Sequence, residues 1–226
     1  MENERIILFD IDKTLINPRV FLDGLCKNLE EQEIIKRDSF KKVFDSYEEE
    51  LDSSTDYNPD EFISRISEIS GKSRKEIQKI FNDERLWEDV VYKECRETLE
   101  KLKGLGYSLG IYSEGFTSYQ LAKLRLTGLD EFFEDELLFI HRRKLDDDFI
   151  ENLPDGVTIV DDKREVIERL NEEDRFNLVW IDRIGRQGIE GIDILDSLER
   201  LPDILERREI SEEEFIDDEE EISRVV

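Results

Sequence analysis

Residues 6–15 read Ile6-Ile7-Leu8-Phe9-Asp10-Ile11-Asp12-Lys13-Thr14-Leu15. The first four form a short, continuous apolar run, which is typical of a strand that is buried on both faces of a parallel sheet. Polar residues begin at Asp10, where this strand should end. Because ligands of open parallel sheets bind beyond the carboxyl ends of the strands, the stretch predicts a central strand followed by functional residues.

From residue 94 onward, segments with the pattern of helices alternate with segments with the pattern of strands. We predict strands near 108–112, 137–140, 157–160 and 176–181, and helices near 95–103, 117–126, 147–152 and 163–171. Such alternation indicates an α/β fold with a Rossmann-like parallel sheet, whose strands are joined by right-handed crossovers.

Residues 17–92 have a different pattern, without a convincing strand. They contain charged helical stretches at 39–51, 59–69 and 73–81. The last stretch begins with Ser73 and has Glu76 three residues on, which is the capping-box pattern of a helix start. We therefore predict an α-helical insertion at 17–92 within a core made of residues 1–16 and 93–205. Residues 206–226 would form an acidic tail, as a solvated helix or a disordered segment.

The composition argues against several classes of partner. With 33 basic and 60 acidic residues among 226, the net charge of -27 repels nucleic-acid phosphates and anionic lipid head groups. We expect no nucleic acid and no membrane as partners. No apolar stretch approaches the roughly 18 to 20 residues that cross a bilayer, and the N-terminus lacks the pattern of an export signal. Cys26 and Cys95 are far apart and have no neighbouring His or second Cys, which favours a reducing, cytoplasmic location.

Acidic residues gather at the ends of predicted strands. Asp10 and Asp12 are two apart at a strand terminus, where the period of two sends both side chains the same way. Two neighbouring carboxylates repel each other, so a cation is the natural way to hold them together. With Asp161 or Asp162 added, the site offers the hard oxygen ligands that suit Mg²⁺, and it lacks the His and Cys that zinc favours.

A hydroxyl and an ammonium belong to the same predicted edge of the sheet. Ser113 follows the strand at 108–112, and Lys144 follows the weaker strand at 137–140. A metal, a lysine and a carboxylate nucleophile meet the needs of phosphoryl transfer, because charge must be neutralised on the transferring oxygens. The alternative interpretations are a capping or turn role for Ser113, and a solvated basic patch around Lys144 in which Arg143 is the phosphate ligand.

Taken in order, these residues resemble the motifs of the haloacid dehalogenase (HAD) superfamily. The resemblance spans residues 5 to about 204 and rests on residues 6–15, Ser113, Lys144 and Asp161-Asp162. The helical insertion after the first motif resembles the cap of the phosphoglycolate phosphatase-like branch. The resemblance thus implies a HAD-like core with an inserted α-helical cap.

The sequence departs from the family pattern at three places. Lys13 stands where Gly is usual, and Leu145 follows the motif lysine where Pro is frequent. The fourth motif is Asp161-Asp162 instead of Gly-Asp. This last departure leaves open which of the two carboxylates touches the metal directly.

The resemblance implies a role for each motif residue. Asp10 would attack phosphorus and form an aspartyl-phosphate, while Asp12 would protonate the leaving oxygen and later take a proton from water. The magnesium ligands would be Asp10, the backbone carbonyl of Asp12, and Asp161 or Asp162. The phosphate-binding residues would be Ser113, Lys144 and Thr14, the last by ordering the first loop.

These residues predict a magnesium-dependent phosphatase that hydrolyses a small organic phosphomonoester, so the expected partner is a small phosphorylated metabolite. Dehalogenases expel a halide, which needs no proton, and lack a carboxylate at the position of Asp12, so this residue favours phosphate chemistry. One alternative is a sugar phosphomutase that uses the same aspartyl-phosphate. The other is a non-catalytic protein of the same fold that binds phosphate or a protein partner.

Overall fold

The computed structural model describes residues 5–208 of the chain. Six parallel strands form one sheet in the order β3-β2-β1-β4-β5-β6. They are β1 (Ile6–Phe9), β2 (Ser108–Glu114), β3 (Leu138–His141), β4 (Thr158–Asp161), β5 (Asn177–Ile181) and β6 (Asp193–Leu195). All four residues of β1 are buried, because this strand lies in the middle of a sheet that is covered on both faces. The predicted α/β fold is confirmed.

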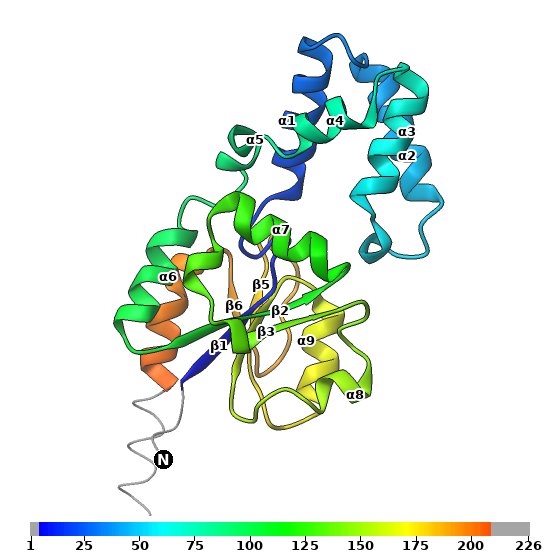
Figure 1. Ribbon diagram of the computed structural model, residues 1–226. Helices are drawn as coiled ribbons and strands as arrows, with labels where there is room; N and C mark the ends of the chain where they lie inside the picture. The colour runs from blue at the N-terminus through cyan, green and yellow to red at the C-terminus, as the bar shows by residue number, and fades with distance from the viewer. Residues whose placement is uncertain (1–4, 209–226) are drawn as a thin grey trace, which may run out of the picture.

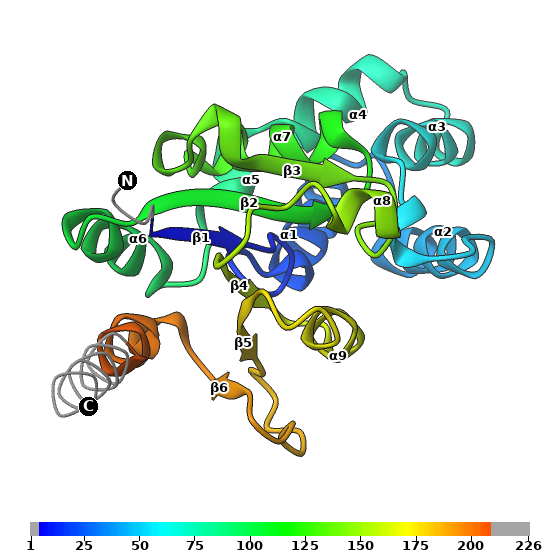
Figure 2. The ribbon, with the colours of Figure 1, turned by 90° about the horizontal axis from the view of Figure 1, so that it is seen from below.

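Helices cover both faces of the sheet. Side chains of β1 alternate between these faces, as the period of two requires. Ile7 belongs to the apolar cluster that includes residues of α6 (Cys95–Gly104), α7 (Thr117–Thr127) and the helical residues 201–208. Leu8 belongs to the cluster on the other face, with residues of α8 (Asp147–Ile150) and α9 (Arg164–Asn171). Figure 2 shows α6 and α9 on opposite sides of the sheet.

Between β1 and α6 the chain forms five helices, which we call the cap. They are α1 (Pro18–Glu31), α2 (Arg37–Glu49), α3 (Pro59–Ser70), α4 (Arg74–Phe81) and α5 (Glu84–Glu88). Figure 1 shows α1 to α4 gathered at one end of the molecule, opposite the N-terminus. The predicted capping box is confirmed, because Ser73 and Glu76 each accept a hydrogen bond from the other's backbone N–H.

The chain enters and leaves the cap at one place. The Asn17 N–H donates to the carbonyl of Val90 at 2.7 Å, and the Tyr92 N–H donates to the carbonyl of Leu15 at 3.1 Å. The two crossing segments are therefore tied to each other next to the end of β1. The division into a core at 1–16 and 93–205 and a cap at 17–92 stays a prediction, and the acidic tail predicted at 206–226 lies outside the described residues beyond position 208.

Several elements differ from the sequence-based prediction, three of them in the core. β6 was not predicted, because it is a three-residue strand at the edge of the sheet, too short to show a pattern of alternation. β2 extends through Glu114, since β3 pairs with it as far as that residue. The predicted helix at 147–152 is shorter, and α8 ends at Ile150.

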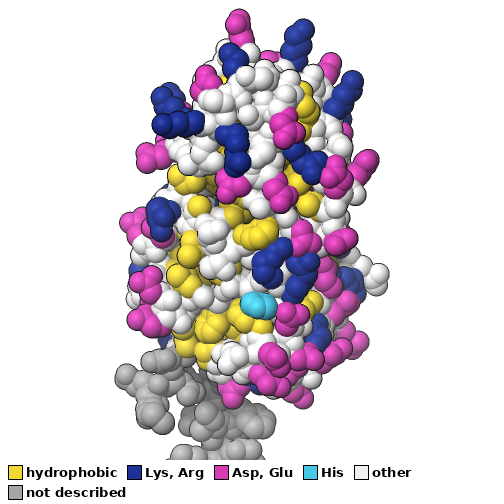
Figure 3. All heavy atoms as spheres, turned by 45° about the vertical axis from the view of Figure 1, so that its right-hand side comes forward, with side chains coloured by type: hydrophobic (Ala, Val, Ile, Leu, Met, Phe, Trp, Pro, Cys, Tyr) yellow, Lys and Arg dark blue, Asp and Glu magenta, His cyan; other side chains and the backbone are white. Residues whose placement is uncertain are grey.

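Bulk features of the chain also have structural counterparts. Cys26 and Cys95 are both free and buried. In the part of the chain that the structure describes, every helix is too short or too polar to cross a membrane. In Figure 3, Lys, Arg, Asp and Glu side chains cover the outer end of the cap, while hydrophobic side chains become visible closer to the middle of the molecule. On this face, apolar surface thus runs from the inner part of the cap down over the core.

Candidate active site

The carboxyl ends of four neighbouring strands bring the predicted residues together. Asp10 directly follows β1, Ser113 lies near the end of β2, and Asp161 is the last residue of β4. Lys144 comes from the loop after β3. Because these strands are parallel and adjacent in the order β3-β2-β1-β4, their ends meet at one edge of the sheet. We call Asp10, Ser113, Lys144, Asp161 and Asp162 the polar floor.

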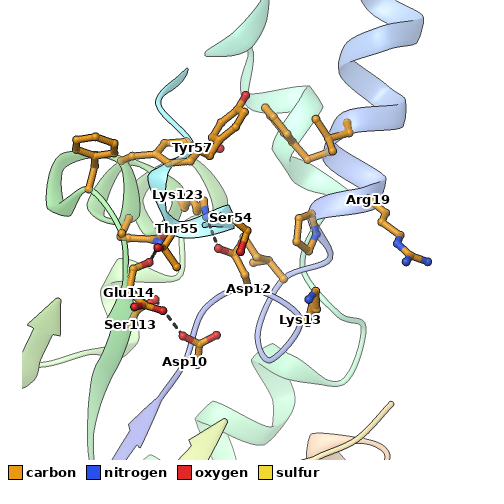
Figure 4. A pocket seen from close by; sticks show the side chains of 18 of the residues that line it. Asp10, Asp12, Lys13, Arg19, Ser54, Thr55, Tyr57, Ser113, Glu114 and Lys123 are labelled. Carbon is orange, nitrogen blue, oxygen red and sulfur yellow. Dashed lines mark hydrogen bonds and ion pairs between the residues drawn. The ribbon is translucent and has the colours of Figure 1, made fainter. Parts of the chain in front are cut away.

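Asp10 is held from several sides. Its carboxylate oxygen Oδ1 accepts hydrogen bonds from Ser113 Oγ at 3.1 Å and from Lys144 Nζ at 2.9 Å. Its backbone N–H donates to the carbonyl of Val160 at 2.9 Å. Figure 4 shows the contact with Ser113. Both side-chain donors reach Oδ1, so within residues 5–208 the other oxygen, Oδ2, has no side-chain donor.

Lys144 is fully buried between two carboxylates. Its ammonium contacts Asp161 as well as Asp10, and burial lowers its pKa less than these two carboxylates raise it, so the group stays charged. Burial raises the pKa of Asp161, while the Lys144 ammonium acts in the opposite direction. Asp161 also accepts a hydrogen bond from the backbone N–H of Lys163 at 2.8 Å. Lys144 therefore forms a buried ion pair. It does not belong to a solvated basic patch, which was the alternative interpretation.

Three buried carboxylates form a candidate metal site. Asp10, Asp161 and Asp162 each offer an oxygen, and these oxygens lie within 4.8 Å of one another. Burial raises the pKa of Asp162 to about 6, and the nearby charge of Asp10 adds to this effect. These carboxylates repel one another when they are ionised, and a bound cation would stabilise the cluster. Hard oxygen donors without His or Cys suit Mg²⁺.

The Asp12 side chain pairs with a residue that the sequence analysis did not predict. Its oxygen Oδ2 pairs with Nζ of Lys123, which comes from α7 and is 7% exposed in its side chain. The other oxygen, Oδ1, is buried and has no hydrogen-bond partner among the described residues. Asp12 therefore contributes no side-chain oxygen to the carboxylate cluster, and it faces the cavity beside Asp10 (Figure 4).

A signal for Lys123 was present in the sequence. Gln120, Lys123 and Thr127 are all buried on α7, at spacings of three and four where an amphipathic helix normally places apolar residues. Polar residues on the inner face of a helix need partners. Nothing in that pattern names Asp12 as the partner.

Thr14 lies apart from the cavity. It is fully buried, its hydroxyl has no partner among the described residues, and it does not line the cavity that Asp10 and Ser113 line. The loop around it is held by Arg183, whose guanidinium donates to the carbonyl oxygens of Lys13 at 3.1 Å and Thr14 at 2.9 Å. Arg183, which was not among the predicted site residues, therefore holds the first loop through two backbone carbonyls, and the role of Thr14 in ordering this loop stays a prediction.

Lys13 explains why glycine is frequent at this position. Its φ is 64°, in the left-handed region that residues with a Cβ adopt at a cost. The tight turn is closed by a hydrogen bond from the Lys13 N–H to the carbonyl of Ile16 at 2.7 Å. The Lys13 ammonium lies 3.7 Å from Asp162 Oδ2. The chain thus accepts backbone strain here and places a cation at the edge of the carboxylate cluster.

A cavity of about 310 Å³ lies over Asp10, Asp12, Ser113 and Asp162, and cap residues line its other side. Two arginines of the core hold the cap over it. Arg143 makes paired hydrogen bonds to the Asp56 carboxylate, at 3.0 and 2.8 Å, and Arg142 contacts the same carboxylate. Arg142 also donates to the carbonyl of Thr55 at 3.0 Å. Arg143, which we considered as a phosphate ligand, therefore serves as a link between core and cap.

The fold and site define a class of enzyme: a hydrolase with an aspartate at the end of the central parallel strand and a helical cap inserted after it. The chain belongs to the haloacid dehalogenase-like hydrolases, because the sequence model of that family matches residues 4–175. The recognition made from the motifs is confirmed at the level of this superfamily. Among curated proteins, none matches the chain.

Solved structures of the same fold cover nearly the whole chain. A HAD phosphatase from Thermococcus onnurineus is 22% identical with a TM-score of 0.56, covering 89% of this chain and 97% of that one. A HAD-hydrolase from Bacillus subtilis bound to magnesium is 17% identical with a TM-score of 0.58, covering 90% and 99%. A defluorinating L-2-haloacid dehalogenase is 15% identical with a TM-score of 0.58, covering 88% and 94%. At these identities the likeness shows the fold, and the site must decide the chemistry.

Proposed function

We propose that this hydrolase is a magnesium-dependent phosphatase that cleaves a small phosphomonoester through an aspartyl-phosphate on Asp10. The observation that carries the proposal is the second carboxylate, Asp12, which faces the same cavity as Asp10 and is held by Lys123. An alcohol is a poor leaving group and needs a proton, which a positioned carboxyl group supplies. A halide needs none. The pair of aspartates therefore favours phosphate esters over haloacids.

Each step of the proposed reaction uses a group of this chain. Asp10 Oδ2 forms a bond to phosphorus while the bond from phosphorus to the ester oxygen breaks, and Asp12 gives its proton to that oxygen. The alcohol leaves. Asp12 then takes a proton from a water whose oxygen attacks phosphorus, and inorganic phosphate departs as Asp10 is restored. Ser113 and Lys144 hold the carboxylate of Asp10 in place through both halves.

The carboxylate cluster fits a magnesium ion. Asp161 is engaged by Lys144 and by the backbone of Lys163, whereas Asp162 lines the cavity and has, among the described residues, one longer ion pair to Lys13. We therefore assign direct ligation to Asp162 together with Asp10, and a supporting role to Asp161. A bound ion would neutralise charge on the phosphoryl oxygens.

The cavity favours a small metabolite as the partner. Its volume of about 310 Å³ is at the lower end of the range for small-molecule sites. The net charge of -27 disfavours nucleic acid. The helical cap above the site supports a kinship with the phosphoglycolate phosphatase-like branch, in which the cap would exclude water during turnover.

The test is hydrolysis of p-nitrophenyl phosphate by the full chain with and without Mg²⁺. We expect turnover that requires Mg²⁺, and a loss of at least about 1,000-fold in Asp10→Asn because the nucleophile is gone. Asp148→Asn is the matched control, since Asp148 belongs to a second Asp-x-Asp sequence, Asp146 and Asp148, and is exposed. It should keep full activity.

Other outcomes separate the alternatives. Activity that survives Asp10→Asn would reject the covalent route. Chloride release from 2-chloropropionate without phosphatase activity would establish a dehalogenase instead. A requirement for a sugar bisphosphate would favour the phosphomutase, and no turnover of any substrate would favour a binding protein.

A further inference from the structure

The side of the cavity that faces the polar floor is built from partly buried apolar residues, which we call the apolar wall. Its members come from α1, α2, the segment around Ser54–Asp56, and the start of α7. They are Leu22, Phe44, Leu51, Tyr57, Phe116 and Tyr119. Figure 4 shows Tyr57 on the far side of the cavity from Asp10. A ligand whose phosphate sits at Asp10 must therefore place its alcohol part against this wall.

The rings of the apolar wall are fixed before any ligand arrives. Phe44 packs edge-on against Phe62, with 5.6 Å between ring centroids, and Tyr57 packs against Tyr119 at 5.7 Å. The Arg142 guanidinium lies 3.7 Å from the Phe116 ring centre. Because these contacts hold the rings in place, an apolar ligand would meet a preformed surface at little cost in ordering.

Several polar side chains around the cavity are engaged elsewhere, whereas Glu48 and Ser54 line it with exposed side chains. The Thr55 hydroxyl donates to Ser53 and accepts from Arg143. Lys163 is paired with Glu114 at 2.9 Å. Arg19 is exposed, and in Figure 4 its guanidinium points away from the cavity. The buried part of the wall therefore offers few partners to a ligand with many hydroxyls, and buried hydroxyls without partners are unfavourable.

Two buried polar atoms near the wall have no hydrogen-bond partner among the described residues: the Tyr57 hydroxyl and Gln120 Oε1. They offer a small number of hydrogen bonds to a ligand that is otherwise apolar. An apolar pocket with a few placed polar groups is the usual design of a site for a small, mostly apolar molecule.

We propose that the substrate is the phosphate ester of a small apolar alcohol, with an aromatic or branched aliphatic body, and not a sugar or polyol phosphate. The inference rests on the proposed phosphatase function and names the class of alcohol that the enzyme releases. Each methylene that moves from water onto the apolar wall should improve the specificity constant about fourfold. The preference is set at the apolar wall, while the polar floor treats all esters alike.

The test compares primary alkyl esters, whose leaving groups need the same help from Asp12. The probes are 2-phenylethyl phosphate, n-butyl phosphate, glycerol 1-phosphate and glucose 6-phosphate, with kcat/KM measured on the full chain and Mg²⁺. We expect 2-phenylethyl phosphate to exceed glycerol 1-phosphate at least about tenfold, with n-butyl phosphate between them. Equal or better turnover of glycerol 1-phosphate or glucose 6-phosphate would overturn the substrate class and leave the phosphatase function standing.

Substitutions in the apolar wall locate the preference. Phe44→Ser and Leu22→Asn should each lower kcat/KM for 2-phenylethyl phosphate about fivefold to tenfold and leave glycerol 1-phosphate unchanged. Two variants are used because Phe44 also packs against Phe62. Ile69→Ser is the matched control, since Ile69 is 60% exposed on α3 and lies outside the cavity. Equal losses for both esters would contradict the proposed wall, and a wild type that cleaves no ester would refute the phosphatase and the substrate class together.

Discussion

The polar floor and the apolar wall face each other across one cavity and are built by different means. In the floor, charged groups are deeply buried, and Asp10, Lys144 and Asp161 are each held by more than one hydrogen bond. In the wall, aromatic rings pack on one another, and the Tyr57 hydroxyl lacks a partner. Buried ions need defined geometry, whereas apolar contact is non-directional. The polar floor therefore fixes the reaction, while substitutions in the apolar wall can change which ligand binds.

The largest expected effect comes from Lys144→Met, which removes the ammonium of the polar floor. The change leaves Asp10 and Asp161 as buried carboxylates without their ammonium, which should cost about 3–5 kcal/mol in the free energy of unfolding. Urea denaturation without metal measures this loss. Lys101→Met, at an ion pair of 3.7 Å with Asp203 on the surface, should cost less than about 1 kcal/mol. Equal costs for the two variants would contradict the buried network.

The next effect is kinetic and lies where floor and wall meet. Lys123→Met frees the Asp12 carboxylate from its partner and should slow alkyl esters by about 10- to 100-fold, because proton donation to the leaving oxygen is then poorly aligned. p-Nitrophenyl phosphate needs little proton donation, so its rate should change far less. The ratio of the two rates is the measurement. A loss that is equal for both esters would mean that Lys123 has only a structural role.

The floor could be predicted because the sheet itself creates it. Short apolar runs such as Ile6–Phe9 identify central strands, and parallel strands bring their carboxyl ends to one edge. The places of Asp10, Ser113 and Lys144 after these runs predicted the edge of the sheet, and the resemblance to the family motifs favoured Lys144 over Arg143. Thr14 shows the limit of this reasoning. It follows the same strand and was predicted among the phosphate-binding residues, but it does not line the cavity.

The wall and its attachments could not be predicted, because they depend on how the cap lies on the core. Lys123 and Asp12 are 111 positions apart, and Arg143 and Asp56 are 87 apart. A polar residue on a helix face shows that a partner exists without naming it. β6 was missed for a local reason, since three residues at a sheet edge carry too little pattern.

A smaller effect is expected where the core holds the cap. Asp56→Asn weakens the pairing with Arg142 and Arg143, which are partly exposed. We therefore expect the free energy of substrate binding to weaken by about 1 kcal/mol, which is roughly a fivefold rise in KM with kcat little changed. Steady-state kinetics with 2-phenylethyl phosphate measure it. Asp60→Asn is the control on the same cap, because its ion pair with Arg74 is exposed and 3.8 Å long. A fall in kcat with KM unchanged would show that Asp56 acts on chemistry instead of cap position.

The smallest effect concerns backbone strain at the edge of the floor. Lys13→Gly relieves the left-handed φ of 64° and should raise stability by less than about 1 kcal/mol, since glycine also loses more chain entropy on folding. The thermal midpoint should rise by about 2 °C. Lys13→Ala separates the causes, because it removes the ammonium near Asp162 but keeps the strain, and it should give no rise. If alanine and glycine stabilised the protein equally, the lost charge and not the backbone conformation would be the reason, and the usual glycine at this turn would need another explanation.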